Sequence, residues 1–549
     1  MPLSRLNKEQ YAAATSTDTQ NLIIASAGTG KTSTIVGRIG YLISSGIKPE
    51  EILLLTFTNK AANEMKERIR ELIKKKADNM WMGTFHSIFA KILRIEAKHT
   101  AYKNNFSIYD TEDSLSLVNN IINNFDIDIE GIKPNSIRHR ISFMKNHMVM
   151  PKEFRKNHVN SFVDEKIADI YDEYQKRLVA NNAMDFDDLL LKPIELFNAK
   201  PNILQKYKKK FSYILVDEFQ DTNKAQYELL KVFVSRSCKI KVVGDDAQSI
   251  YSWRGANLDK MLNFGKDYPK HKVFRLEQNY RSTKIILQAA DSIIKNNKEQ
   301  LIKTLWTENN DGEKLSVIKC ADEKDEALQI ARHIKREITK KKLSHKDFTV
   351  LYRTNAQSRV LEDIFRKEKL PYAIIGGVEF YRRKEVKDII AYLRVIVNQN
   401  DEESLLRIMN FPQRGIGNTT VTRMIAFARK HDISLFQTMA RVFEVIEIKG
   451  KGNRDKFKKF LDNLRIPSFF VADLDYVNQV GTDEIKKLFE TNKKNIDNDV
   501  IKNQKSKDGD SLVDAIETAV TTNDVSALSE GTYVVVATQL NWVNKLIVR

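Results

Sequence analysis

Residues 21–32, Asn-Leu-Ile-Ile-Ala-Ser-Ala-Gly-Thr-Gly-Lys-Thr, decide how this chain folds. The apolar run at 22–24 predicts a short buried strand, and the small residues after it predict a tight turn into a helix that begins near Lys31. Glycines in such a turn let backbone N–H groups point inward and surround phosphate oxygens, and the helix adds its positive N-terminal end. The stretch therefore predicts a strand, a phosphate-binding loop and a helix.

The side chains of this loop are those that a nucleoside triphosphate requires. Lys31 can reach the outer phosphates, and the hydroxyl of Thr32 can ligate a magnesium ion. The strict pattern has glycine where this chain has Ala25, so the loop alone leaves an ordinary glycine-rich strand-to-helix turn as the alternative. The residues expected to contact the nucleotide are Ala25, Ser26, Ala27, Gly28, Thr29, Gly30, Lys31 and Thr32.

Length and composition limit the class of protein. The 549 residues, 42% of them hydrophobic, suffice for about three or four domains. No apolar run approaches the roughly 20 residues that span a membrane, and no secretory signal follows Arg5 and Lys8. Cys238 and Cys320 form no metal or redox motif. We therefore expect a cytoplasmic protein without a membrane partner.

The net charge is +18, with 90 Lys and Arg against 72 Asp and Glu. Such an excess suggests a polyanionic partner, nucleic acid first. The alternative is a composition that is simply rich in lysine and asparagine.

Polar residues follow several other predicted strands at their carboxyl ends, where open α/β sheets bind ligands. Residues 52–57 predict a strand that ends at Phe57 and leads to Asn59. Residues 83–87, with Thr84 and His86, repeat this arrangement ahead of an amphipathic helix.

A further apolar strand, at 213–216, delivers Asp217 and Glu218. Asp217 can hold magnesium, and Glu218 can orient and deprotonate the attacking water. Two acids at the end of a buried strand are costly without a cation, so we prefer the catalytic interpretation.

Residues 239–256 form a third unit of this kind. Gln248 lies just past the strand end, where it can sense the terminal phosphate. Tyr251, Trp253 and Arg254 follow, and aromatic faces beside a cation suit the stacking of unpaired bases. A core position is the alternative for Trp253, which its polar neighbours disfavour.

The rest of the chain shows less chemistry. Residues 96–184 predict an inserted helical subdomain, and for the acids of 185–188 we prefer N-terminal capping of a helix. Near residue 275 a second α/β domain begins, with strand signals at 315–319 and 348–352. The chain is helical from 376, and the tail carries one late strand signal at 533–537.

This ordered series of motifs resembles the UvrD/Rep/PcrA group of superfamily 1 DNA helicases from residue 6 to about residue 420. The resemblance implies an α/β fold of the P-loop NTPase type, in which ATP and Mg²⁺ bind between two RecA-like domains that carry mostly helical insertions. It implies ATP-driven 3′→5′ movement along single-stranded DNA and unwinding of duplex DNA in repair or replication. Repair or replication proteins are then candidate partners.

The resemblance also implies a role for each motif residue. Gln10 would read adenine, and Tyr280 would stack on it. Gln248 and Arg281 would couple loss of the γ-phosphate to domain motion. The residues implied to bind Mg-ATP and activate water are Lys31, Thr32, Asp217 and Glu218. The residues implied to line the DNA track are Phe57, Asn59, Thr84, His86, Phe186, Tyr251, Trp253, Arg254, Arg353 and Asn355.

The expected domains follow from the same comparison. Residues 1–95 and 185–274 would form the first RecA-like domain, interrupted by the helical insertion 96–184. Residues 275–375 would form a partial second RecA-like domain. Residues 376–448 would form its helical insertion, and 449–549 a polar tail.

Two departures from the family pattern stand out. Ser33 occupies the position where the family has an arginine that packs on adenine. The family's late motifs V and VI, Thr-x-His-x-x-Lys-Gly and Tyr-Val-x-x-Thr-Arg-Ala, are missing, because the last histidine is His431. The only later arginines, none in that context, are Arg441, Arg454, Arg465 and Arg549. Loss of an arginine finger lowers turnover by a factor of about 10³–10⁵.

Three hypotheses follow. The first is a DNA helicase of this type. The second is an ATP-responsive single-stranded DNA-binding protein, truncated or degenerate and without unwinding activity, which the missing motifs favour. The third is a helicase–nuclease subunit, ranked last because the sequence contains no recognisable nuclease domain.

Overall fold

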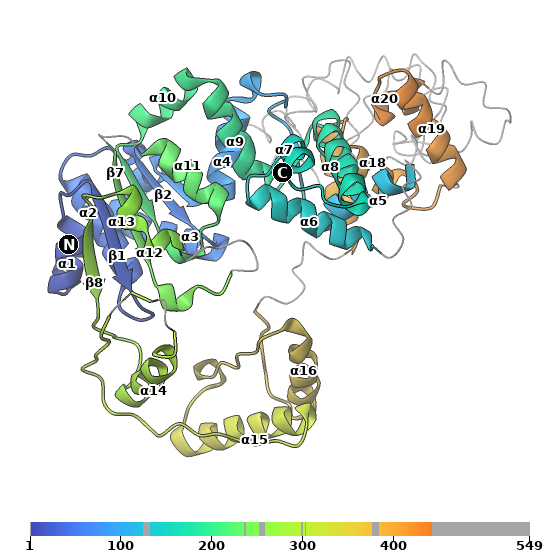
Figure 1. Cartoon of the computed structure of the whole chain (residues 1–549). Helices are drawn as coiled ribbons and strands as arrows, with labels where there is room; N and C mark the ends of the chain where they lie inside the picture. The colour runs from blue at the N-terminus through green and yellow to red at the C-terminus, as the bar shows by residue number, and fades with distance from the viewer. Residues whose placement is uncertain are drawn as a thin grey trace, which may run out of the picture. The chain divides into compact units, whose positions relative to one another are not determined.

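The computed structural model describes residues 2–124, 132–234, 238–251, 259–297, 300–301, 303–375, 384–414 and 416–441. The chain divides into two compact units, Met1–Glu403 and Ser404–Arg549. The first unit contains the sheet that carries most of the sequence motifs, with helices on both of its faces (Figure 1).

The sheet has six parallel strands in the order β3-β2-β6-β7-β1-β8. In chain order the strands are β1 (Gln20–Ala25), β2 (Ile52–Thr56), β3 (Trp81–Thr84), β6 (Tyr213–Val216), β7 (Lys239–Gly244) and β8 (Lys272–Leu276). Because all six run the same way, their carboxyl ends lie along one edge of the sheet. The predicted strands at 22–24, 52–57, 213–216 and after 239 are confirmed, and with them the α/β fold.

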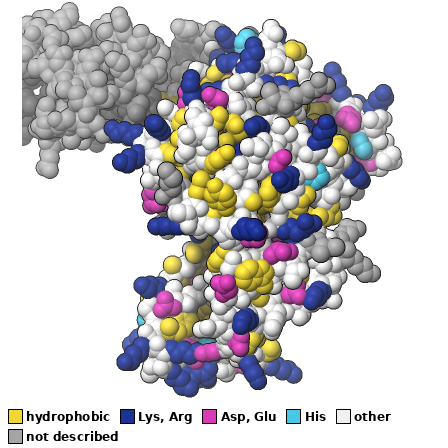
Figure 2. Space-filling view, turned by 90° about the vertical axis from the view of Figure 1, so that its left-hand side faces the viewer, with side chains coloured by type: hydrophobic (Ala, Val, Ile, Leu, Met, Phe, Trp, Pro, Cys, Tyr) yellow, Lys and Arg dark blue, Asp and Glu magenta, His cyan; other side chains and the backbone are white. Residues whose placement is uncertain are grey.

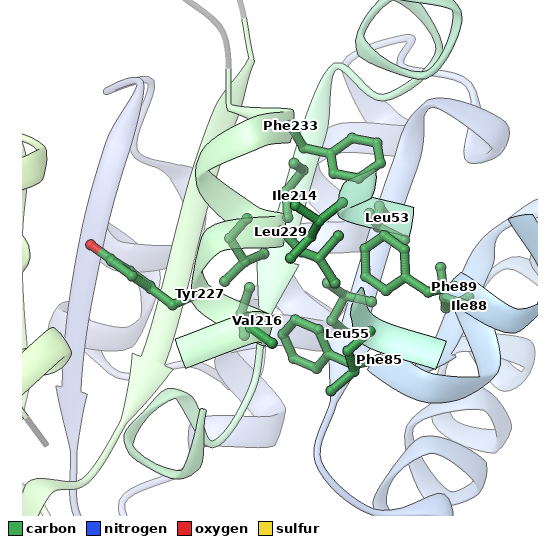
Figure 3. Close-up of a cluster of buried hydrophobic side chains, with 14 of the residues drawn as sticks. Leu53, Leu55, Phe85, Ile88, Phe89, Ile214, Val216, Tyr227, Leu229 and Phe233 are labelled. Carbon is green, nitrogen blue, oxygen red and sulfur yellow. The ribbon is translucent and has the colours of Figure 1, made fainter. Parts of the chain in front are cut away.

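Alternating apolar residues bury both faces of the sheet. Leu22 and Ile24 face one apolar cluster, whereas Ile23 between them faces the other. The first cluster is formed with α4, α9, α10 and α11, and Figure 3 shows part of it, including Phe85, Phe89 and Phe233. Each fully buried side chain of this size contributes about 1.5–3 kcal/mol, so the sheet is fixed from both sides.

The helices that cover the sheet are short and follow the strands closely. They are α1 (Lys8–Thr15), α2 (Lys31–Ser44), α3 (Asn59–Ile73), α4 (Phe85–Ile95), α9 (Asp188–Ala199), α10 (Pro201–Lys210), α11 (Lys224–Phe233), α12 (Asp259–Leu262) and α13 (Phe264–Asp267). Hydroxyl side chains start two of them: Thr58 accepts the N–H of Ala61 at 3.1 Å, and Thr84 accepts that of Ser87 at 3.2 Å. Such caps end each loop within a few residues of its strand.

The helical insertion leaves and rejoins the sheet through a small two-stranded sheet, in which β4 (Ser107–Tyr109) pairs in parallel with β5 (Ala183–Asp185). Between these strands lie α5 (Thr111–Asn124), α6 (Pro134–Asn146), α7 (Pro151–Asn157) and α8 (Phe162–Ala180). Their apolar faces form a separate core around Tyr109, Tyr171 and Leu178.

A buried ion cluster joins this insertion to α9. Lys145 is fully buried and lies 2.6 Å from Asp185 and 3.1 Å from Asp188. Tyr174 donates its hydroxyl hydrogen to Asp185 at 3.0 Å. Asp185 also accepts the N–H of Asp188, the first residue of α9, at 2.8 Å, whereas Asp187 at the N-cap position makes no side-chain cap hydrogen bond, so the capping interpretation fails for Asp187. Burial and the charge of Asp185 raise the pKa of Asp188.

The next part of the first unit contains α14 (Lys284–Ile294), α15 (Glu323–Lys341) and α16 (Ser358–Lys367). Here the prediction of strands at 315–319 and 348–352 is wrong, because neither segment pairs with another in the part of the chain that the structure describes. Phe348 and Val350 pack on α15 and α16, whereas Leu351 is 88% and Val317 96% exposed. The alternating apolar residues of 348–352 therefore bury one side of the segment, but a β-strand also needs a neighbouring segment for its backbone hydrogen bonds.

The last described helices are α17 (Lys384–Val397), α18 (Glu402–Met409), α19 (Asn418–Lys430) and α20 (Leu435–Arg441). Within the first unit, Arg394 of α17 forms an ion pair with Asp113 of α5 at 2.7 Å. The predicted strand at 533–537 and the polar tail lie outside the described residues.

The ion cluster gives the first testable prediction. Lys145→Met should lower the free energy of unfolding by about 3–5 kcal/mol at pH 8, because it leaves buried carboxylates without their cation. The loss should be smaller at pH 5.5, where a carboxyl group with a raised pKa takes up a proton and no longer needs the lysine. Chemical denaturation at the two pH values measures both effects.

Arg155 provides a matched control, because its ion pairs with Asp169 at 2.9 Å and Asp172 at 2.8 Å are partly exposed. Arg155→Met should change stability by less than about 1 kcal/mol. Equal losses of unfolding free energy for Lys145→Met and Arg155→Met would contradict a stabilising role for the buried ion cluster.

Candidate active site

The loop after β1 adopts the geometry of a phosphate cradle. Gly28 and Gly30 have φ angles of 76° and 84°, which residues other than glycine rarely adopt. The loop is also crowded from outside: a Cβ atom on Gly30 would collide with the amide of Gln10, and one on Gly28 would lie 2.6 Å from the Cβ of Arg281. Glycine is therefore required at both positions.

An ion pair joins the loop after β1 to the end of β6. Lys31, the first residue of α2, lies 2.7 Å from the carboxylate of Glu218, which follows β6. Glu218 has a φ of 50°, a strained conformation of the kind that clusters at functional sites. The sequence thus correctly placed these two side chains together, although they are 187 residues apart.

Asp217 and Asp221 flank this ion pair and are both buried. Burial and the charge of Glu218 raise the pKa of Asp217 to about 6, although Lys31 opposes the shift. The same two causes raise the pKa of Asp221 to about 7. One carboxylate oxygen of Asp221 is buried without a hydrogen-bond partner. Two buried acids with raised pKa values are typical of a site that accepts a cation.

The donor set fits a nucleotide with its magnesium. The hydroxyl of Ser26, inside the loop, is buried and has no hydrogen-bond partner. In the described part of the chain no group of three or more His, Cys, Asp or Glu side chains could hold a metal ion. Magnesium commonly binds one or two protein oxygens together with substrate phosphates and waters, so a site without such a group of protein ligands is compatible with this ion.

Residues of the N-terminus and of the segment after β8 close around the loop. Gln10 is buried, donates to the carbonyl of Thr29 at 2.9 Å and accepts the N–H of Asn7 at 3.0 Å. Asn7 in turn donates to the hydroxyl of Tyr280 at 2.8 Å. Asn279 donates to the carbonyl of Ala27 at 2.7 Å. These contacts bring the two predicted adenine contacts, Gln10 and Tyr280, to the same loop.

The loop after β7 carries the predicted phosphate sensor. Gln248 donates to the carboxylate of Asp245 at 2.6 Å, so its amide is held within its own loop. Lys303 forms ion pairs with Asp245 and Asp246, and all three side chains are buried. The segment that leaves the sheet is thereby tied to the end of β7.

In the described residues, five of the ten predicted DNA contacts lie at or after the ends of β2, β3 and β7, and Phe186 follows β5. The rings of Phe57 and Tyr251 have centroids 5.0 Å apart and are tilted by 34°. His86 meets Phe186 edge-on, with centroids 5.8 Å apart, and Phe186 is half exposed. The structure therefore joins four of the predicted aromatic contacts in two pairs.

The remaining predicted DNA contacts differ in their surroundings. Thr84 is buried and its hydroxyl caps α4, while Asn59 is exposed at the start of α3. Arg353 and Asn355 are exposed in the loop that leads into α16. Trp253 and Arg254 lie outside the described residues.

Several residues that connect the site were not singled out from the sequence. Asn7, Asn279, Gln220, Asp245 and Lys303 all hold motif residues in place through hydrogen bonds or ion pairs. Gln220 follows Glu218 by two residues, and Asp245 directly follows β7. Their position near a strand end is the sequence feature that could have identified them. Nothing in the local sequence marks Lys303.

The surface agrees with the basic composition. Lys and Arg side chains are spread over the face drawn in Figure 2, with Asp and Glu among them. None of the helices in the described residues is both long and apolar enough to cross a lipid bilayer.

Comparison with known proteins identifies the family. Residues 6–269 match the UvrD/REP helicase N-terminal domain, and residues 274–466 match the UvrD-like helicase C-terminal domain. The chain belongs to the UvrD/Rep/PcrA family of superfamily 1 helicases. The family fold is a P-loop NTPase with two RecA-like domains; in this chain the six-stranded sheet belongs to the first, and segments 315–319 and 348–352 of the second are unpaired within the described residues.

Individual relatives support the same family. The chain is similar to the ATP-dependent DNA helicase PcrA of Bacillus subtilis, with 44% identity over 466 residues, 84% of this chain and 63% of the relative. It is 44% identical to PcrA of Staphylococcus aureus over 438 residues, 80% of this chain and 60% of the relative. It is 42% identical to PcrA of Staphylococcus epidermidis over 482 residues, 87% of this chain and 66% of the relative. The chain thus spans less than two thirds of each.

Asp221 gives a prediction about pH. Its pKa is raised in the folded protein, so the folded state binds more protons than the unfolded state and this group lowers stability as pH rises through about 7. Asp221→Asn should therefore stabilise the nucleotide-free protein at pH 8 by about 1–3 kcal/mol, and much less at pH 5.5. Thermal unfolding of both proteins at both pH values measures this. A stability difference that is independent of pH would contradict it.

Proposed function

We propose that this protein is an ATP-dependent 3′–5′ DNA helicase that moves along single-stranded DNA and unwinds duplex DNA in repair or replication. The observation that carries the proposal is the common sheet edge, where Lys31 and Glu218 lie 2.7 Å apart and the Phe57–Tyr251 pair lies on the neighbouring strand ends. Family membership supports both halves of this site.

ATP is the proposed nucleotide, and the side chains around the loop have defined tasks in its hydrolysis. The backbone of the loop and Lys31 bind the phosphates, while Gln10 and Tyr280 hold the adenine. Thr32 and Asp217 hold magnesium, which neutralises charge on the phosphate oxygens when it is bound. Glu218 accepts a proton from the attacking water, and Gln248 and Arg281 respond to the γ-phosphate.

The ion pair between Lys31 and Glu218 defines the resting state of this site. Phosphate oxygens compete with Glu218 for the ammonium group, so nucleotide binding releases the carboxylate for its task as a base. The protein therefore keeps both charges compensated before the substrate arrives.

On the DNA side, the two aromatic pairs offer faces for unpaired bases. Stacking on such faces tolerates any sequence, as a protein that moves along DNA requires. Asn59, Thr84, Arg353 and Asn355, with Trp253 and Arg254, are proposed as the remaining contacts of the track.

A second candidate is an ATP-responsive single-stranded DNA-binding protein without unwinding activity. The unpaired segments 315–319 and 348–352 favour it, because closure around a nucleotide needs a complete second domain. The two candidates differ in one measurable property, turnover in the presence of DNA.

The hydrolysis assay separates them. The proposal predicts ATP hydrolysis that single-stranded DNA stimulates, and Glu218→Gln should lower the stimulated rate by at least about 100-fold, because it removes the base. Strand displacement on a duplex with a 3′ single-stranded tail should fall in parallel. Binding of both ligands with negligible turnover would instead support the second candidate.

The stacking proposal predicts weaker DNA binding when an aromatic pair is broken. Phe57→Ala should cost about 1–3 kcal/mol in affinity for a short oligothymidylate, measured by fluorescence anisotropy. Phe162, 67% exposed on α8, is a matched control outside the proposed track, and Phe162→Ala should leave the affinity unchanged. Equal effects of both substitutions would refute a specific track at Phe57.

A further inference from the structure

Gln220 occupies a position between two motifs of the site. It lies in the short turn after Glu218 and is 1% exposed. Its amide nitrogen donates to the carboxylate of Glu218 at 2.9 Å, and its amide oxygen accepts the N–H of Asp245 at 3.0 Å. One buried amide thus joins the proposed base, at the end of β6, to the first residue after β7.

The packing leaves this amide little freedom. A Cβ atom on Gly244 would lie 2.7 Å from the amide oxygen of Gln220, so the last residue of β7 must be glycine for the amide to reach Asp245. The backbone carbonyl of Gln220 also accepts a hydrogen bond from the hydroxyl of Ser249 at 3.4 Å. Gln220 therefore holds the β7 loop at both ends.

From Asp245 the contacts continue toward the DNA side. Asp245 accepts hydrogen bonds from the N–H of Ala247 at 3.2 Å and from the amide of Gln248 at 2.6 Å. The described part of the same loop reaches Tyr251, which pairs with Phe57. A continuous series of polar contacts thus runs from Lys31 through Glu218 and Gln220 to the loop that carries Tyr251.

We propose that Gln220 is a positioning residue that couples Glu218 to the β7 loop, so that the nucleotide state alters the DNA contact at Tyr251. This inference rests on the proposed function. When nucleotide binding breaks the ion pair with Lys31, Glu218 moves to act as the base. The amide of Gln220, which is bonded to Glu218, then shifts, and its hydrogen bond to Asp245 transmits the shift to the loop. Glutamine suits this task because one group supplies both a donor and an acceptor.

Two variants separate the two hydrogen bonds. In Gln220→Met the new side chain has a similar size but forms neither hydrogen bond. In Gln220→Glu the new side chain keeps an acceptor for the N–H of Asp245 and loses the donor to Glu218. The matched control is Gln226→Met, because Gln226 is also buried, accepts the N–H of Asn223 at 2.8 Å and belongs to a helix cap.

The first measurement is ATP turnover with and without oligothymidylate. Both Gln220 variants should lower the ratio of stimulated to unstimulated kcat by about tenfold, a larger loss in the stimulated than in the unstimulated rate. Gln226→Met should keep the wild-type ratio. A parallel fall of both rates together with a lower melting temperature would overturn the proposal, since a purely structural role predicts that result. Gln220→Glu carries the test alone if Gln220→Met does not fold.

The second measurement keeps this proposal separate from the proposed function. Hydrogen exchange of the backbone in residues 239–251 is recorded with and without a non-hydrolysable ATP analogue and magnesium. The wild type should show a nucleotide-dependent change that Gln220→Met lacks. If the wild type has no DNA-stimulated turnover, the helicase proposal fails, and this exchange difference still decides the coupling. An equal change in wild type and variant overturns it.

Discussion

The parallel order of the six strands is the constraint on which the rest of the structure depends. The order β3-β2-β6-β7-β1-β8 places the loop after β7 between the phosphate loop after β1 and Glu218 after β6, and the side chain of Lys31 reaches Glu218 from the β1 side. The aromatic residues that follow β2 and β3 lie on the other half of the same edge. Neither half could be assembled from residues close in sequence, so the sheet must form before either site exists.

Charge balance is the second requirement at this edge. The buried strand β6 leads to Asp217, which is buried, and to Glu218, whose side chain is 31% exposed, and a charge removed from water is expensive unless it is compensated. Lys31 compensates Glu218 directly, and Asp217 responds with a raised pKa. The strained φ of Glu218 persists because the sheet, the ion pair and the amide of Gln220 all fix its position.

The sequence predicted the sheet and the phosphate loop because both are local patterns: an apolar run, a glycine turn and a helix start. It also predicted that Lys31 and Glu218 belong to one site, through the rule that ligands bind at the ends of parallel strands, but not the ion pair between them. It missed the connecting residues Asn7, Gln220 and Lys303, whose partners are set by tertiary packing. It failed at 315–319 and 348–352, because alternation reports a buried face but not a hydrogen-bonding neighbour.

The position of β6 explains why a coupling residue is needed. In the sheet, β6 lies between β2, whose end leads to Phe57, and β7, whose loop carries Gln248 and Tyr251. Backbone pairing fixes the strands themselves, so within this sheet nucleotide binding acts on the side chains and loops beyond the strand ends. A buried amide bonded to both loops shifts with either one, because it has no water to replace a lost partner. The loop after β7 is thus one connection between Glu218 and the aromatic surface, because it neighbours β6 and carries Tyr251, which pairs with Phe57.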